Sequence, residues 1–258
     1  MMKPLIVKDV VLDDGVFEPV LTMVSRNIPE LKEDLKLMEP IPFSVMEWRV
    51  DYFNKDQEQW MDLVMQGLKI IREVFPGKIL IFTYRSFAEG GQSKILDRDL
   101  LKIRERAIAS GDIDFIDMEL YWYEVENMNL AFKYHELLNE CNKKQVKIIL
   151  SYHKFSEKER LPNIKLVMQK MLALGADISK VAVRIHSLDE LENLKSISKE
   201  IVESLEIPHI LIAMGAYGRE SRYDKTSFAS CMTYTSLRGA IAPGQLPKEE
   251  LFHLYESE

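Results

Sequence analysis

The stretch VKIILSYHKFSEKERLPNIKLVMQKMLALGADISKVAVRI (residues 146–185) sets the pattern that decides the fold. Val146–His153 and Ile178–Ile185 are short runs rich in β-branched and apolar residues, as buried strands are. Between them, Glu157–Leu174 spaces its apolar residues like one face of a helix. Strand, helix and strand in this order predict a parallel pair, because parallel strands need a long crossover connection.

The same alternation extends over the whole chain. The other predicted strands are Pro19–Ser25, Phe43–Val50, Lys78–Arg85, Asp112–Leu120, Pro208–Met214 and Cys231–Thr235. The other predicted helices are Asp56–Phe75, Lys94–Ser110, Glu124–Asn142, Leu188–Leu205, Arg219–Phe228 and one after Pro247. Eight strands alternating with helices in 258 residues predict an α/β fold, a single TIM (β/α)8 barrel domain over residues 1–258.

The opening LIVKDVVL-DDG-VFEP (residues 5–19) predicts a β-hairpin ahead of the first core strand, with its turn at DDG. An open doubly wound sheet is the alternative fold, and it would need a glycine-rich phosphate loop after an early strand. The glycine pairs at 90–91 and 215/218 have neither GxGxxG nor GxxxxGK spacing, so the barrel is favoured.

The composition narrows the class of partner. Lysine and arginine number 34 against 41 acidic residues, a net charge of −7, which argues against nucleic acid and anionic membranes. A small anionic substrate needs only a few basic side chains. Cys141 and Cys231 have no CxxC spacing and are expected to be free thiols. The first residues carry acids where a signal peptide would be apolar, so a cytoplasmic protein is expected.

Charged residues occur inside the predicted strands. In the second strand, Glu47 and Arg49 share one face while Met46 and Trp48 take the other, which suits packing under helices. Glu47 and Arg49 are therefore predicted to point into the barrel near its carboxyl end, where barrel active sites lie. They form either a buried structural ion pair or a polar pair that binds substrate.

Two further strands end in residues that can bind or react. Arg85 ends the third strand, where a guanidinium can hold a carboxylate or phosphate with two hydrogen bonds; a surface arginine is the alternative. His153 ends the fifth strand on the same face as Ser151. Its position favours a role in proton transfer, and a structural histidine is the alternative.

The sixth strand is the most informative, because Lys180 lies on its inward face beside the small Ala182. Burial disfavours the charged form of a lysine, and a neutral amine can attack a carbonyl. The alternative is a buried salt bridge with Asp117 or Glu119. A lysine and a histidine on neighbouring strands make an imine-forming pair, with lysine as nucleophile and histidine moving protons.

Two segments near the C-terminus extend this picture. Arg219 and Arg222, after the seventh strand, offer a second site for an anion. GAIAPGQ (residues 239–245) follows the eighth strand and is predicted to be a mobile lid with Gln245 as its polar tip.

Taken together, these motifs resemble the type I 3-dehydroquinate dehydratases over nearly the whole chain. The matching segments are EWRVDYF (47–53), FTYRSFAEGG (82–91), IDMEL (116–120), SYHKF (151–155), KVAV (180–183), MGAYGRESR (214–222) and APGQ (242–245). The resemblance implies a TIM barrel, a homodimer, no metal and no cofactor. It implies a cytoplasmic lyase of the shikimate pathway, which feeds chorismate and aromatic amino acid biosynthesis.

The resemblance also implies roles for individual residues. The implied reaction is the dehydration of 3-dehydroquinate to 3-dehydroshikimate. Lys180 forms an imine (Schiff base) with the substrate ketone, His153 takes the C2 proton and protonates the leaving hydroxyl, and Glu89 orients His153. The implied substrate-binding residues are Glu47, Arg49, Arg85, Met214, Arg222, which binds the carboxylate, and Gln245, which closes from the lid.

The chain departs from the family pattern at Ile241, where a small hydroxyl residue is usual and a hydrogen bond to substrate would be lost. Two other function classes stay open at this point. Another Schiff-base barrel, such as an aldolase, would share Lys180 but not the full set of arginines. A non-catalytic sugar-acid-binding protein would have no need of a buried amine.

Overall fold

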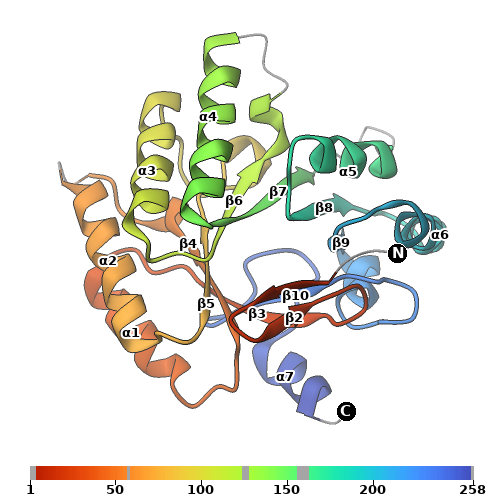
Figure 1. Ribbon diagram of the computed structural model, residues 1–258. Helices are drawn as coiled ribbons and strands as arrows, with labels where there is room; N and C mark the ends of the chain where they lie inside the picture. Colours follow the sequence, from red (N-terminus) through yellow and green to blue (C-terminus); the bar gives the residue numbers. More distant parts are fainter. Residues whose placement is uncertain (1–3, 57–58, 124–127, 156–162, 257–258) are drawn as a thin grey trace. The chain divides into compact units, whose positions relative to one another are not determined.

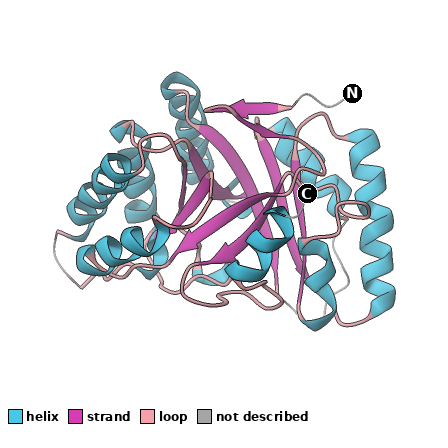
Figure 2. Cartoon of the chain, turned by 90° about the horizontal axis from the view of Figure 1, so that it is seen from below, coloured by secondary structure: helices cyan, strands magenta, loops and turns pink. Residues whose placement is uncertain are grey.

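The computed structural model describes residues 4–56, 59–123, 128–155 and 163–256 (Figure 1). The chain divides into two compact units, one of residues 22–148 and the other of residues 1–21 with 149–258. Each unit has its own parallel strands and its own helices. Figure 2 distinguishes the helices from the strands by colour. The assignment of residues 1–258 to one domain stays a prediction.

The described residues contain every predicted core strand. These are β3 (Glu18–Met23), β4 (Val45–Arg49), β5 (Ile79–Thr83), β6 (Phe115–Glu119), β7 (Lys147–Lys154), β8 (Ile178–Arg184), β9 (His209–Met214) and β10 (Met232–Ser236). The helices are α1 (Ile28–Met38), α2 (Trp60–Val74), α3 (Asp97–Ser110), α4 (Met128–Lys144), α5 (Ile164–Ala173), α6 (Leu188–Ser204) and α7 (Lys248–Glu256). Short 3-10 turns are η1 (Val50–Tyr52), η2 (Phe87–Glu89), η3 (Leu120–Tyr123) and η4 (Ala216–Arg222).

The N-terminal hairpin is confirmed, but its predicted turn was wrong. Strands β1 (Leu5–Val7) and β2 (Val10–Leu12) pair antiparallel. Lys8 and Asp9 make the two-residue turn with φ of 46° and 66°, the backbone that tight hairpins need. The DDG segment instead follows β2 and makes a separate turn, in which Val16 N–H donates to Asp13 C=O at 3.1 Å.

In the unit of residues 22–148, strands β4, β5 and β6 are parallel neighbours in that order. The register sets Arg49 beside Thr83 and Thr83 beside Asp117, so the polar residues of the three strands share one face. Helices α1 to α4 are packed successively, each against the next (Figure 1).

In the other unit, β7, β8 and β9 are parallel neighbours. The segment entering β10 lies between β9 and β3: Cys231 N–H donates to His209 C=O at 2.8 Å, and Glu18 N–H donates to Cys231 C=O at 2.9 Å. The last strand of the chain is thereby joined to β9 on one side and to β3, the first core strand, on the other.

Two helices differ from the prediction. Helix α1 was not predicted, although Asn27 caps it by accepting from Glu30 N–H and Leu31 and Leu35 repeat at helical spacing. The predicted helix Arg219–Phe228 was wrong, because only the 3-10 turn η4 forms there. Asp224 Oδ1 accepts from the backbone N–H of the second and third residues after it, and this local turn competes with a helix.

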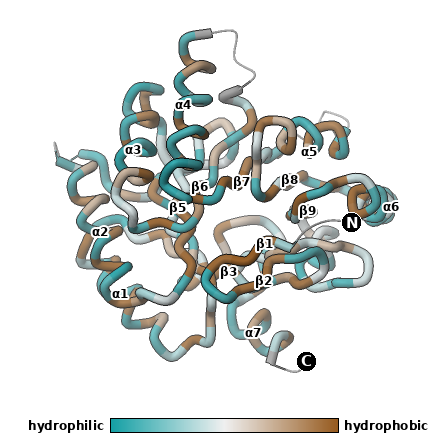
Figure 3. Tube along the Cα trace, in the orientation of Figure 1, coloured by the Kyte–Doolittle hydropathy of each residue, from teal (hydrophilic) through white to brown (hydrophobic). Residues whose placement is uncertain are grey.

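The outer face of β4 packs under α2, as predicted for Trp48. The Trp48 side chain is fully buried, and a Cβ added at Gly67 of α2 would lie 2.5 Å from its ring and 3.0 Å from Leu31. Figure 3 shows α2 apolar on one side and polar on the other. A glycine inside a helix costs stability, so its presence here reflects the room that the indole needs.

Two further observations concern the cysteines and the helices. Cys141 and Cys231 are both free and buried, as predicted. Among the described residues, no helix combines the length and apolar character that a membrane span requires.

We expect Gly67→Ala to destabilise the protein by about 1–3 kcal/mol, because overpacking against Trp48 outweighs the better helix propensity of alanine. Thermal unfolding measures this, at roughly 2–4 °C per kcal/mol. The control is Gly77→Ala, since a Cβ there meets nothing within 4 Å. If the melting temperature of Gly67→Ala equals or exceeds that of Gly77→Ala, α2 is able to shift outward and relieve the contact.

Candidate active site

Lys180 is buried on the inner face of β8, with 4% of its surface exposed. Its Nζ lies 4.0 Å from the centre of the Tyr234 ring, which comes from β10. An aromatic face stabilises a positive charge at that distance. Tyr234 was not predicted, because nothing in the β10 sequence distinguishes it from a core residue.

His153 lies on the same face as Lys180. Ser151 of β7 is the register partner of Lys180, and His153 is two residues further along β7, opposite Ala182. His153 is half-buried. Met214 of β9 pairs with Arg184, which extends this face by one more row. The structure thus brings together the predicted lysine, histidine and methionine on neighbouring strands.

Arg222, in η4, is a buried cation without a counter-charge among the described residues. Its side chain is 2% exposed and its Nε has no hydrogen-bond partner. Burial lowers the pKa of Arg222 to about 10, because the charged form loses its hydration. The backbone oxygen of Arg222 accepts from Thr233 Oγ1 at 2.9 Å, which fixes the start of its side chain. Such a guanidinium is prepared to bind an anion.

The predicted lid packs against its own unit. Gln245 is 7% exposed, and its Oε1 accepts from Ile241 N–H at 2.8 Å. Gly244 has a φ of 77°, and a Cβ there would lie 2.6 Å from the carbonyl oxygen of Gly215. The Gly215 N–H donates to Pro243 C=O at 3.4 Å. Residues 241–245 are therefore held against the connection between β9 and η4.

In the unit of residues 22–148, Glu47 and Arg49 have separate partners. Glu47 accepts hydrogen bonds from Thr22 Oγ1 at 2.9 Å and Thr83 Oγ1 at 2.8 Å. Arg49 binds Asp51 with two hydrogen bonds of 2.7 and 2.9 Å. Burial disfavours the charge of Arg49, but Asp51 outweighs it and raises the pKa of Arg49. The ion pair of Arg49 is thus with Asp51, two residues further along the chain, and not with Glu47.

Arg85 is buried in a cluster of acids. Its Nη2 is 2.7 Å from Asp117, and its Nη1 is 3.3 Å from Glu119 and 3.7 Å from Glu89. Burial disfavours the charge of Arg85, but these carboxylates outweigh it and raise its pKa well above the ordinary value. Asp117 and Glu119, considered as partners for Lys180 from the sequence, are therefore partners of Arg85.

The loop after β5 fixes Glu89. Ser86 Oγ accepts from Glu89 N–H at 3.3 Å, and Gly91 N–H donates to Ser86 C=O at 2.7 Å. A Cβ at Gly91 would lie 2.0 Å from the Arg85 carbonyl oxygen, so only glycine permits this closure. Glu89 is 7% exposed as a result.

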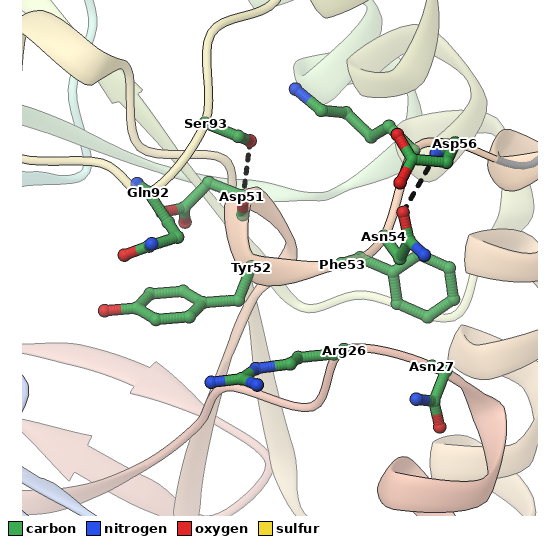
Figure 4. A pocket seen from close by; sticks show the side chains of 10 residues that line it. Arg26, Asn27, Asp51, Tyr52, Phe53, Asn54, Asp56, Gln92 and Ser93 are labelled. Carbon is green, nitrogen blue, oxygen red and sulfur yellow. Dashed lines mark hydrogen bonds between the residues drawn. The ribbon is translucent and has the colours of Figure 1, made fainter.

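An open cavity of about 610 Å³ lies beside these residues in the same unit (Figure 4). Arg26, Tyr52 and Gln92 line it, with Asp51 and Ser93 at its wall. Glu47, Arg49, Arg85 and Glu89 do not line this cavity. Within the described ranges, no group of histidine, cysteine and acidic side chains could hold a metal ion.

The family of the chain follows from its similarity to known proteins. Residues 20–258 match the family described as type I 3-dehydroquinase. The chain belongs to the type I 3-dehydroquinase family. It is 31% identical over 257 residues to the 3-dehydroquinate dehydratase of Listeria innocua, covering 99% of this chain and 98% of the relative. With the Escherichia coli protein of that name it shares 30% identity over 251 residues, covering 97% and 96%.

Solved structures of 3-dehydroquinate dehydratases have the same fold as this chain. The type I 3-dehydroquinate dehydratase of Clostridium difficile superposes with a TM-score of 0.89 at 25% identity, covering 100% of this chain and 98% of that one. The protein of Geobacillus kaustophilus gives 0.86 at 25% identity, covering 99% and 96%. The predicted (β/α)8 barrel class is confirmed, the doubly wound alternative is excluded, and this type I 3-dehydroquinase family member is a hydro-lyase.

Because the charge of Arg222 is buried without a counter-ion, we expect Arg222→Met to raise the melting temperature of the ligand-free protein. Removing such a charge is worth about 1–2 kcal/mol, at the low end of what replacement of buried ion pairs by apolar residues yields. Thermal unfolding at neutral pH measures it. Arg219→Met is the control, since Arg219 is exposed and pairs with Glu250. A melting temperature below that of the wild type would show that the charge is stabilised.

Proposed function

We propose that the protein removes water from 3-dehydroquinate to give 3-dehydroshikimate through an imine on Lys180, the third step of the shikimate pathway. Membership of the type I 3-dehydroquinase family supports the reaction class. The observation that carries the assignment to Lys180 is its burial on the inner face of β8, with His153 on the same face of the next strand. The Clostridium difficile relative is described with a covalently modified comenic acid, which supports covalent chemistry.

The proposed reaction begins at the amine of Lys180. It attacks the ketone carbon at C3, and loss of water leaves a protonated imine. His153 removes the C2 proton, and the electron pair of that bond moves toward the imine nitrogen to give an enamine. The enamine then expels the C1 hydroxyl, which takes a proton from His153. Water hydrolyses the product imine and frees Lys180.

Tyr234 explains why the position of Lys180 on β8 suits an imine. Its ring faces Nζ of Lys180 at 4.0 Å. The protonated imine places a positive charge at this nitrogen, so the ring stabilises the intermediate. Tyr234 therefore adds electrostatic stabilisation at the atom where charge develops.

Arg222 is the proposed partner of the substrate carboxylate. Its guanidinium is buried and its Nε lacks a hydrogen-bond partner. A carboxylate supplies the missing charge and two acceptor oxygens. This explains how a chain with a net charge of −7 binds an anion.

The remaining roles follow the family resemblance. Glu89 orients His153, and Met214 packs on the substrate ring. The polar groups of the substrate are bound by Glu47, Arg49 and Arg85, with Gln245 contributing from the loop. Ile241, in the same loop, offers the substrate only an apolar contact. A homodimer in the cytoplasm that needs no metal or cofactor completes the proposal; light scattering and activity in the presence of EDTA test its assembly and its metal requirement.

We expect borohydride added with 3-dehydroquinate to attach one reduced ligand to the peptide that contains Lys180. Lys180→Ala should lose the adduct and nearly all turnover, because no other amine replaces the nucleophile. Mass spectrometry of the digest measures the adduct, and Lys165→Met, at an exposed lysine, is the control. An adduct on another lysine would refute the role of Lys180. An adduct without release of water would favour another Schiff-base lyase.

We expect His153→Ala to keep the imine adduct but to lower kcat by about 10²–10⁴-fold, the usual worth of a general acid–base group. The reason is that the imidazole moves protons and does not form the covalent bond. Steady-state kinetics and borohydride trapping on the same preparation separate the two steps. A His153→Ala enzyme within tenfold of the wild type would mean that another residue moves the proton.

A further inference from the structure

Arg104 of α3 is a fully buried cation to which the proposed reaction gives no role. Its Nη1 donates to the Tyr134 hydroxyl at 3.2 Å, and its Nη2 donates to the Tyr84 carbonyl at 3.4 Å. Its Nε has no hydrogen-bond partner. Burying a guanidinium with one donor unsatisfied is costly, and an apolar side chain would fill the same space at less cost.

The charge of Arg104 faces Glu119. The Nη2 of Arg104 is 3.9 Å from Oε2 of Glu119. The other oxygen of Glu119 accepts from Ser86 N–H at 2.6 Å and lies 3.3 Å from Nη1 of Arg85. Glu119 is therefore held between a cation in the helix layer and the backbone at the end of β5.

Ser86 links Glu119 to Glu89 through its own hydrogen bonds. Its hydroxyl accepts from Glu89 N–H at 3.3 Å, and its carbonyl accepts from Gly91 N–H at 2.7 Å. At the far end of the same loop, Gln92 N–H donates to Asp51 at 2.9 Å. The loop thus has two anchors, and Arg104 acts on the one next to Glu89.

We propose that Arg104 is a positioning residue, which acts through Glu119 to fix the Ser86 amide and so the loop that carries Glu89. The consequence for turnover rests on the proposed function. Burial raises the pKa of Tyr134 to about 12, so its phenol stays neutral and accepts from Arg104. Tyr134 therefore holds Nη1 of the guanidinium, while Nη2 faces Glu119.

Hydrogen exchange tests the positioning without any substrate. In Arg104→Met, the Ser86 amide should exchange about tenfold faster or more, because its acceptor loses a cationic neighbour. The Gln92 amide should keep its wild-type rate, since Asp51 holds it independently. Tyr134→Phe should give the same pattern more weakly, and it serves alone if Arg104→Met does not fold. Arg106→Met, on the exposed pair with Asp62, is the matched control on the same helix.

Kinetics test the consequence. We expect Arg104→Met to lower kcat by about 10- to 100-fold, the scale of a small misplacement, with KM changed less. The acidic limb of the pH profile should move to lower pH, because a less well held Glu89 stabilises the protonated imidazole of His153 less, and Arg104→Lys should restore part of kcat. Unchanged Ser86 exchange, or a lower kcat with an unchanged pH profile, would overturn the proposal. A wild-type enzyme that does not turn over 3-dehydroquinate would overturn the proposed function instead, and leave the exchange test standing.

Discussion

Inside the unit of residues 22–148, the guanidinium of Arg85 lies within 3.7 Å of three carboxylates, those of Asp117, Glu119 and Glu89. Breaking a buried ion pair by removing one member costs several kcal/mol, so each of these groups requires the others. Asp117 and Glu119 come from a rigid strand, but Glu89 comes from a loop. The loop therefore has to be as fixed as the strand, and its closure through Gly91 achieves this.

In the unit of residues 149–258 with 1–21, the described surroundings of the buried cations are different. Arg222 has no ion pair in the described part of the chain, and its Nε lacks a hydrogen-bond partner. The Nζ of Lys180 faces an aromatic ring, which attracts a cation without neutralising it. In this unit, unlike the cluster around Arg85, burial of the Arg222 charge is therefore a cost to folding that the described residues do not compensate in the ligand-free protein.

The order of the strands and the face of each charged residue could be predicted from the sequence. Inward and outward residues alternate along a strand, and this alternation is visible wherever one face is apolar. The parity of the sixth strand placed Lys180 inward, and the structure agrees. What the parity could not show is the partner of each charge. Arg49 turns to Asp51 two residues on, and Tyr234 meets Lys180 from a strand more than fifty residues away. Those pairings depend on side-chain rotamers and register. For helix α1 the sequence does carry a signal, since Asn27 is a favourable N-cap residue directly before it.

The joining of the first and last core strands has a consequence for synthesis. Residues 22–148 are continuous in sequence and can complete their contacts as soon as they leave the ribosome. Residues 1–21 emerge earlier, but their backbone partner Cys231 is made more than two hundred residues later. Until then the N-terminal segment has exposed backbone donors and acceptors, which are an aggregation hazard. This segment is thus made before residues 22–148 but reaches its place after them.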